Sequence, residues 1–170
     1  MISTDHLMEL PNWSTRSSSA ASMLNPALIS LCIAAAAIRF EDERGERMPW
    51  ELSFLVPPMA LHRDTRETLP NRIDSHMPRW VERNPVLHAG LSARAQSMSP
   101  FVREGLRFGI RVEALRLHDD ATVSGRILGK VNRDADAELS AIIKSSGFLG
   151  RWFGHIGDQA TVYGVLGVTP

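Results

Sequence analysis

The sequence has little cysteine, little lysine and no excess of either charge. Its single cysteine, Cys32, excludes an internal disulfide and a thiolate metal cage, and it lies in an apolar run typical of a core. Lys130 and Lys144 are the two lysines among 19 basic residues, which balance 19 acidic residues. Without net charge or a block of like charges, nonspecific binding to nucleic acid or to a membrane has no electrostatic basis.

The sequence also lacks an apolar run of membrane-spanning length. The apolar stretch over residues 27–38 is well short of the roughly 20 residues that a membrane-spanning helix needs. It also starts too far from the first residue for a signal peptide. We therefore expect a cytoplasmic protein without a membrane partner.

The composition that is present fits one globular domain. The 170 residues are 44% hydrophobic and 22% charged, which suffices for one core and leaves no room for two full domains. Residues 1–23 contain a serine run and few apolar side chains, so we expect an N-terminal arm there. We expect residues 24–170 to form a single compact domain, mainly α-helical, with one short β-hairpin.

Several helix starts are marked by a capping residue followed by proline. This pairing satisfies an orphan amide and presets the first helical dihedral angle. Pro49 is expected to open a helix, and residues 25–40, which are apolar on nearly every face, are expected to form the central buried helix. The capping pairs are Asn25-Pro26, Asn84-Pro85 and Ser99-Pro100.

The rest of the chain predicts further helices and a hairpin. Pro57 and Pro58 should interrupt the helix expected over residues 49–61, because proline lacks a donor. Alternation around an Asp-Asp turn makes residues 114–125 the hairpin candidate. The other expected helices are a short turn from Asp64 or Thr65 to Leu69, residues 75–83 capped by Ser75, 85–97, 100–112, 135–144 capped by Asp134, 148–156 after a break at Ser145-Ser146-Gly147, and 158–166 ended by Gly167, where an edge strand is the alternative.

No combination of residues predicts a catalytic, cofactor or metal site. The six histidines are scattered, and no pair has the helical spacing of zinc ligands. The group His118-Asp119-Asp120 could hold a general base, but a hairpin turn needs the same residue types, and we favour the turn. The glycines between positions 147 and 157 are separated by bulky side chains, so they fit close helix packing better than a phosphate loop. We therefore expect a noncatalytic protein.

Four side chains are candidates for partner binding. Trp13 lies among polar and turn-forming residues of the arm, and tryptophan is frequent at interfaces. Residues 62–67 resemble the start of a kinase catalytic loop, but the chain lacks the other motifs of a kinase. Arg63 and Arg66 lie there beside His62, and an arginine can hold a partner carboxylate with two hydrogen bonds. The alternative is that these residues only end a helix and solvate a turn.

A family resemblance is carried by six segments, in order along most of the chain. They are residues 13–16 (WSTR), 24–27 (LNPA), 49–70 (PWELSFLVPPMALHRDTRETLP), 83–85 (RNP), 101–109 (FVREGLRFG) and 166–170 (LGVTP). Together they resemble the middle component of bacterial three-component ABC ATPase systems, a family that includes Lamassu-type defence systems. In such systems the middle component is encoded with an SMC-like ABC ATPase and with a third, often effector-bearing component. The resemblance implies an adaptor, without catalytic residues or cofactor, that links the ATPase subunit to the effector subunit in antiviral or anti-plasmid defence.

A DNA-binding regulator is the second hypothesis. Three helices expected over residues 74–112 and a following hairpin match the order of a winged helix, whose third helix enters the major groove. Arg103, Arg107 and Arg111 would lie on one face of that helix, although it opens with two apolar residues where base contacts are expected. We favour the adaptor, with DNA contact through the complex as an option. A small enzyme ranks third.

Overall fold

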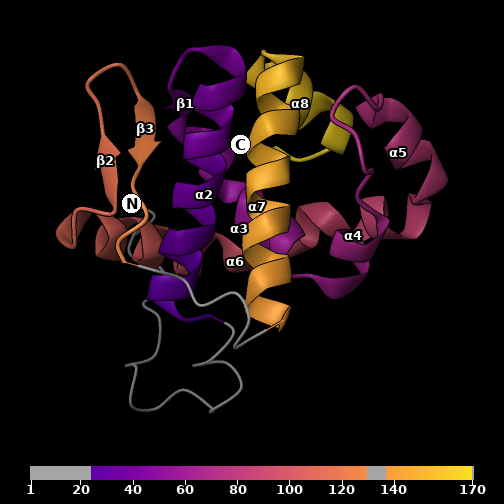
Figure 1. The fold of residues 1–170 in the computed structure, drawn as a ribbon. Coiled ribbons are helices and arrows are strands. Elements are labelled where there is room, and N and C mark those ends of the chain that lie inside the picture. Colours follow the sequence, from indigo (N-terminus) through magenta and orange to yellow (C-terminus); the bar gives the residue numbers. More distant parts are fainter. Residues whose placement is uncertain (1–23, 130–136, 170) are drawn as a thin grey trace, which may run out of the picture.

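Two helices that run side by side in the same direction form the centre of the fold (Figure 1). They are α2 (Pro26–Arg44) and α7 (Ala137–Ile156). The computed structural model describes residues 24–129 and 137–169. The expected N-terminal arm with Trp13, and the expected cap Asp134, lie outside the described residues.

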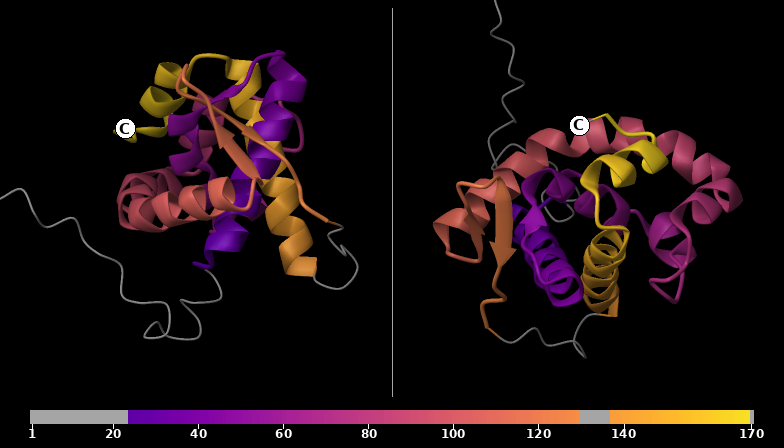
Figure 2. Two further views of the ribbon diagram at one scale, coloured as in Figure 1. Left: turned by 90° about the vertical axis from the view of Figure 1, so that its left-hand side faces the viewer. Right: turned by 90° about the horizontal axis from the view of Figure 1, so that it is seen from above.

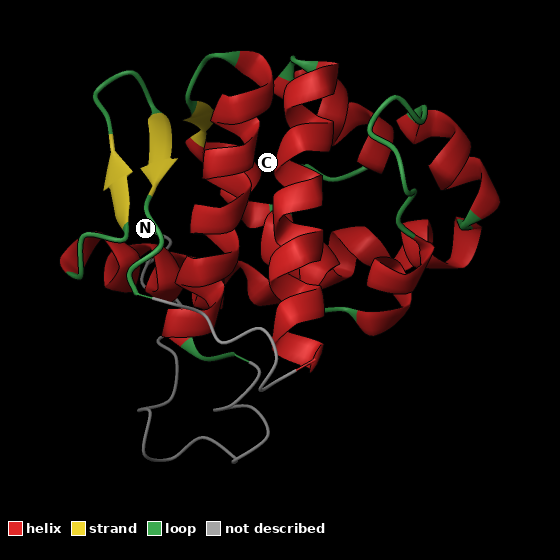
Figure 3. Ribbon diagram, viewed as in Figure 1, coloured by secondary structure: helices red, strands yellow, loops and turns green. Residues whose placement is uncertain are grey.

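Short helices and a small sheet surround this central pair (Figures 2 and 3). Helix α6 crosses one side of the pair, the hairpin lies against α2, and α4 and α5 lie beyond α7. The prediction of a mainly α fold with one short hairpin is confirmed. Across the described ranges, no helix combines the length and the apolar character needed to cross a membrane. The further elements are β1 (Met48–Pro49), the 3-10 helix η2 (Trp50–Phe54), α3 (Val56–Ala60), α4 (Arg63–Thr68), α5 (Met77–Arg83), α6 (Pro85–Arg111), β2 (Leu115–Leu117), β3 (Thr122–Gly125) and α8 (Gln159–Leu166).

Glycines on α7 allow its close approach to α2. A Cβ atom added at Gly150 would overlap the backbone carbonyl of Ala36, and one added at Gly154 would lie 3.2 Å from the Phe40 carbonyl oxygen. The facing stretch of α2 is a run of four alanines, so both helices present small side chains where they meet. The prediction that these glycines permit close helix packing is confirmed.

Helix α2 is the buried central helix that its composition predicts. The Asn25 side chain caps it by accepting a hydrogen bond from the Ala27 N–H at 2.8 Å. Gly45, with a φ of 75°, ends it in the left-handed region. The helix is one turn longer than predicted and reaches Arg44, because the charged residues after position 40 lie on its exposed last turn.

Replacing Asn25 by alanine should lower the free energy of unfolding by about 1 kcal/mol, because the first turn of α2 loses its side-chain acceptor. Urea melts followed by circular dichroism measure this change. Asn71 is the matched control, since its exposed side chain lies outside the helices, and Asn71→Ala should shift stability by about 0.5 kcal/mol or less. Equal midpoints for Asn25→Ala and wild type would show that the cap adds nothing.

Proline interrupts one expected helix and not another. Between residues 49 and 61, η2 stops at Phe54 and a new helix, α3, carries Pro57 and Pro58 near its start, as predicted. Pro100, in contrast, lies inside α6, which is continuous. The helical structure predicted for residues 85–97 and 100–112 is confirmed, but the predicted division into two helices, with a cap at Ser99, is wrong.

Packing explains why α6 continues through its proline. Leu91 in the first half and Val102 in the second are both buried, and Gly105 lies against Ile29 of α2. Burial of both halves on one core outweighs the hydrogen bond that Pro100 cannot donate. Because one helix replaces two, the helix order of a winged helix is absent from residues 74–112.

Helix α7 also continues through a predicted break. Within Ser145-Ser146-Gly147, the buried Ser146 hydroxyl donates a hydrogen bond to the Ile142 carbonyl at 2.8 Å. Gly147 lies against Arg39 of α2, at a position where a larger side chain would have to displace its neighbour. The same residues that favour a break in isolation are thus the ones that fit the helix to its partner.

The predicted hairpin is confirmed, and it belongs to a three-stranded antiparallel sheet. Leu115 pairs with Gly125 and Leu117 with Val123 across β2 and β3. The third strand, β1, pairs with β3 and gives the strand order β1-β3-β2. Pro49 ends this short strand and does not open the α-helix expected there. A two-residue strand has no sequence periodicity, so it could not be predicted.

The short helices begin at different caps from some of those predicted. Ser75 does not cap α5, which follows His76 without a side-chain cap. The Ser75 carbonyl instead accepts a hydrogen bond from the Trp152 indole at 2.8 Å. At the other end of the chain, Asp158 caps α8 and Gly167 ends it, so the helix favoured there is confirmed.

Candidate partner-binding site

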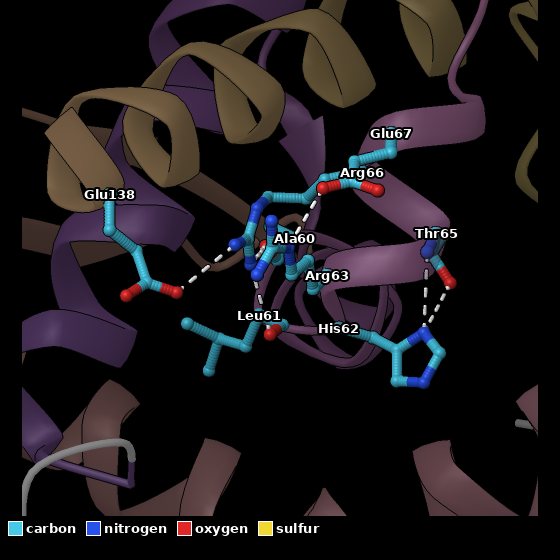
Figure 4. A network of polar contacts seen from close by, with 8 residues as sticks. All are labelled: Ala60, Leu61, His62, Arg63, Thr65, Arg66, Glu67 and Glu138. Atoms are coloured by element: carbon cyan, nitrogen blue, oxygen red, sulfur yellow. Dashed lines mark hydrogen bonds and ion pairs between the residues drawn. The ribbon is translucent and has the colours of Figure 1, made fainter.

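The residues His62, Arg63 and Arg66 lie where α3 meets α4 (Figure 4). The helix α3 has five residues, so its last carbonyls have no donors within the helix. The Arg66 guanidinium supplies them: its Nη1 donates to the Ala60 oxygen at 2.9 Å and to the Leu61 oxygen at 3.0 Å. A cation at a helix C-terminus is also favoured by the helix dipole.

Arg66 is mostly buried and links α4 to a third helix. Its Nη2 forms an ion pair with Glu138 of α7 at 3.2 Å, and its side chain is 8% exposed. Its guanidinium is therefore occupied by contacts within the chain. The interpretation that residues of this segment end a helix fits Arg66 best.

A second arginine, Arg94 of α6, also contacts both α3 and α4 where these two helices meet. Its Nε donates to the Pro58 carbonyl at 3.0 Å, and its Nη2 donates to the Thr65 hydroxyl at 3.3 Å. Burial lowers the pKa of Arg94. Arg94 was not predicted from the sequence, although an arginine three residues after the buried Leu91 and next to Ala95 lies on an apolar stripe of α6. Such a position is a sequence signal for a half-buried, hydrogen-bonded cation.

His62 caps α4, where Asp64 or Thr65 was predicted to do so. Its Nδ1 lies 3.3 Å from the Thr65 backbone nitrogen and 2.9 Å from the Thr65 hydroxyl. A backbone N–H can only donate, so Nδ1 must be the acceptor and the imidazole must be neutral. Burial and the nearby Arg94 lower the pKa of His62, which favours the same form.

Stability should therefore depend on pH through His62. Between its lowered pKa in the folded chain and about 6.5 in the unfolded chain, only the unfolded chain binds the proton. The free energy of unfolding should fall as the pH is lowered through this range. His62→Asn keeps a capping oxygen without a titrating group, so its urea midpoint should fall less than that of wild type between pH 7.5 and pH 5. Identical pH profiles would contradict the assigned cap.

Of the predicted residues in this segment, Arg63 presents its charge to solvent. Its side chain is 79% exposed and forms an ion pair with Glu67, one turn along α4, at 2.8 Å. Exposed pairs of this kind contribute little to stability, so Arg63 is available to exchange Glu67 for a partner carboxylate. The structure thus brings His62, Arg63 and Arg66 together but leaves one of them suited to direct partner contact.

A second candidate surface is a groove bounded by η2, α6 and α8. It encloses about 640 Å³, and Trp50, Phe54 and Tyr163 line it. The rings of Trp50 and Phe54 meet edge to face with centroids 5.5 Å apart. The Tyr163 hydroxyl donates to the Glu51 carbonyl at 2.6 Å, and burial raises the pKa of this tyrosine to about 12. Its aromatic lining is suited to an apolar side chain, and Glu51 and Arg103 add charged groups to the same groove.

The environment of Cys32 and the placement of possible metal ligands bear on two further kinds of chemistry. Cys32 is fully buried, and burial raises the pKa of its thiol to about 11, so the thiolate needed for nucleophilic chemistry is suppressed. Within residues 24–129 and 137–169, no group of histidine, cysteine and acidic side chains could hold a metal ion.

The His118-Asp119-Asp120 group forms the hairpin turn, as favoured from the sequence. The Asp120 carboxylate accepts hydrogen bonds from Thr122 and Arg47, which lower the pKa of Asp120 to about 2. His118 contacts Ser124 on the neighbouring strand at 2.9 Å. These partners are those of a turn.

Comparison with known protein families gives one assignment for almost the whole chain. The family model described as "ABC-three component (ABC-3C) system Middle Component 3" matches residues 13–170. No curated protein and no solved structure matches the chain. Because the family match covers far more than half of the sequence, the chain belongs to the Middle Component 3 family of ABC-three component systems.

Proposed function

We propose that this chain is a noncatalytic adaptor that links an ABC/SMC-like ATPase subunit to an effector subunit in a bacterial anti-phage or anti-plasmid defence complex in the cytoplasm. The observation that carries the proposal is the family match over residues 13–170, which assigns a middle component in a system of three. A middle component has two other components with which to assemble. Mediation between them is the simplest function for a chain without a predicted chemical site.

The form of the molecule supports an adaptor. The central helices α2 and α7 meet closely along several turns, which favours a rigid scaffold. An exposed arginine at α4 and an apolar groove beside α6 lie on this scaffold. Rigid elements that present separate surfaces can hold two partners in a defined geometry.

The adaptor function is tested by expressing the ATPase and the third component with and without this chain. We expect the two to copurify when the chain is present and to separate when it is omitted. Association of the ATPase with the third component to the same extent without the chain would overturn the proposal. The purified chain alone should hydrolyse no ATP, and measurable turnover would contradict its noncatalytic nature.

The prediction that Arg63 and Trp13 contact a partner is tested with Arg63→Glu and Trp13→Ala. Each should reduce copurification with the ATPase while the thermal melt stays close to that of wild type, because the Arg63 side chain is exposed and Trp13 belongs to the predicted N-terminal arm. Arg83→Glu is the matched control, since Arg83 is also exposed and lies at the end of a neighbouring helix. Equal recovery with all three variants would remove Arg63 and Trp13 from the partner site.

A further inference from the structure

Exposed apolar side chains gather beside the hairpin. Among the described residues six large apolar side chains are markedly exposed, and one of them, Val86, lies at the start of α6. The other five lie at the opposite end of α6, on β2 and just after β3, and we call them the hairpin-edge patch. Clusters of exposed apolar groups mark interaction sites more often than scattered ones do. The patch consists of Ile110, Val112, Leu117, Ile127 and Leu128.

Backbone hydrogen bonds hold these segments together at one end of the hairpin. The Ala114 N–H donates to the Gly109 carbonyl near the end of α6, and the Arg126 N–H donates to the Ala114 carbonyl. A hollow of about 500 Å³ lies there, lined by Ile110 and Leu117 among others. The patch therefore borders a concave surface that a partner segment can enter.

Strand β2 has one edge that no other strand of the described residues occupies, because it is the last strand in the order β1-β3-β2. In Figures 1 and 3 it is the outermost strand. Two backbone hydrogen bonds flank the pairing of β2 with β3: the Arg126 N–H donates to the Ala114 carbonyl, and the His118 N–H donates to the Thr122 carbonyl. In an antiparallel pair, residues that hydrogen-bond to the neighbouring strand alternate with residues whose N–H and C=O groups point away from it. Leu115 and Leu117 therefore direct their N–H and C=O groups away from β3, along the open edge.

The charges around this edge are positive. Arg107, Arg111 and Arg116 are exposed, and none of them forms an ion pair within the described residues. Two acidic side chains near them already have basic partners: Glu113 pairs with Arg126 at 3.3 Å, and Asp120 pairs with Arg47 at 2.8 Å.

One further acid, Asp119, belongs to the turn between β2 and β3, and this turn lies away from the end of α6 (Figure 1). The surface beside the apolar patch is therefore complementary to an acidic partner.

We propose that the open edge of β2 accepts an extended segment of a partner protein in which acidic residues alternate with apolar ones. The segment adds a fourth strand by hydrogen bonding to the backbone of Leu115 and Leu117. Its apolar side chains cover the hairpin-edge patch, and its acidic side chains meet Arg111 and Arg116. A nucleic acid would match the arginines but would leave the apolar side chains exposed, since nucleic-acid interfaces are more polar.

This inference rests on the proposed function, because the segment would belong to one of the other two components. The test expresses the chain with the ATPase component and, separately, with the third component, and measures copurification. Leu117→Asp and the double variant Arg111→Glu/Arg116→Glu should each weaken binding of one component by about tenfold or more. Val86→Asp and Arg83→Glu are matched controls, because the exposed Val86 lies at the other end of α6 and the exposed Arg83 ends α5 just before it, and both variants should bind like wild type.

Leu117→Pro distinguishes strand addition from simple apolar contact. Proline removes the outward N–H of Leu117 and leaves the β2–β3 hydrogen bonds intact, since proline is tolerated where an edge N–H faces solvent. We expect binding to be lost while the thermal melt stays that of a folded chain. As a fold-independent readout, the amides of Leu115 and Leu117 should become protected from hydrogen exchange when the partner binds.

The possible results separate the two proposals. If wild type binds neither component, the adaptor proposal and this inference both fail. If wild type binds but Leu117→Asp and Leu117→Pro bind equally well without new amide protection, the inference alone is overturned. If the double arginine variant instead loses retention of a double-stranded DNA oligonucleotide and keeps both protein partners, the edge is a nucleic-acid surface and the inference is likewise overturned.

Discussion

Gly150→Ala is expected to lower the free energy of unfolding by about 3 kcal/mol, because overpacking in a tight core strains backbone that cannot yield. The added methyl group would overlap the carbonyl group and the Cα atom of Ala36. Both overlapping groups belong to the backbone of a buried helix, so relief requires α2 and α7 to move apart. That movement would open contacts along the whole length of the central pair. The strain far exceeds the helix propensity gained, which is about 1 kcal/mol for alanine over glycine.

The control for this variant is Gly164→Ala in α8. Gly164 is also helical, but a Cβ atom there meets nothing within 4 Å. This variant should be neutral or stabilising by up to about 1 kcal/mol, from propensity alone. Urea melts of both variants measure the difference. If Gly150→Ala were as stable as Gly164→Ala, the close parallel packing of α2 and α7 would be wrong.

Arg66→Met is expected to destabilise the fold by about 3 kcal/mol, because charge-assisted hydrogen bonds to buried groups are worth more than ordinary ones and their loss leaves acceptors unpaired. Methionine keeps the apolar stem and removes the guanidinium. The Ala60 and Leu61 carbonyls then lose their donor at the end of α3, and Glu138 loses its ion-pair partner.

Arg63→Met is the matched control, three residues earlier on the same helix. Its side chain is exposed and pairs with a single exposed glutamate, so the expected change is about 0.5 kcal/mol or less. Thermal and urea melts of both variants read the effect. Equal loss of stability would mean that Arg66 acts at the surface like its neighbour. A charge reversal at Arg66 would break the contacts between α3, α4 and α7, so partner binding is tested at Arg63.

The candidate site was only partly predictable. The sequence marks the HRDTRE segment as a helix end rich in arginine, which is correct, but it does not distinguish Arg63 from Arg66. That distinction depends on which side of α4 faces α3 and α7. Arg94, which also contacts α3 and α4, lies 36 positions along the chain from Pro58, to whose carbonyl it donates a hydrogen bond. No local pattern links residues so far apart in the chain.

Some features governed by neighbouring residues were predicted correctly, although Asn84 and Ser75 do not form the side-chain caps expected of them. Asn25 caps α2 through an amide two residues away, Gly167 ends α8, and the Asp-Asp turn closes a hairpin between adjacent strands. Each depends on hydrogen bonds and dihedral preferences within a few residues, so composition and spacing suffice to determine it.

Tertiary packing decided the features where local preference and burial conflict. Pro100 and Ser145-Ser146-Gly147 both favour a helix end by local preference, yet each lies inside a continuous helix. Burial of residues in both flanking halves outweighs the lost hydrogen bond at Pro100, and Gly147 lies in close contact with Arg39 of α2. Residues that are distant in the sequence contribute the free energy of such contacts. Local sequence patterns therefore do not reveal these contacts, which form when the helices pack together.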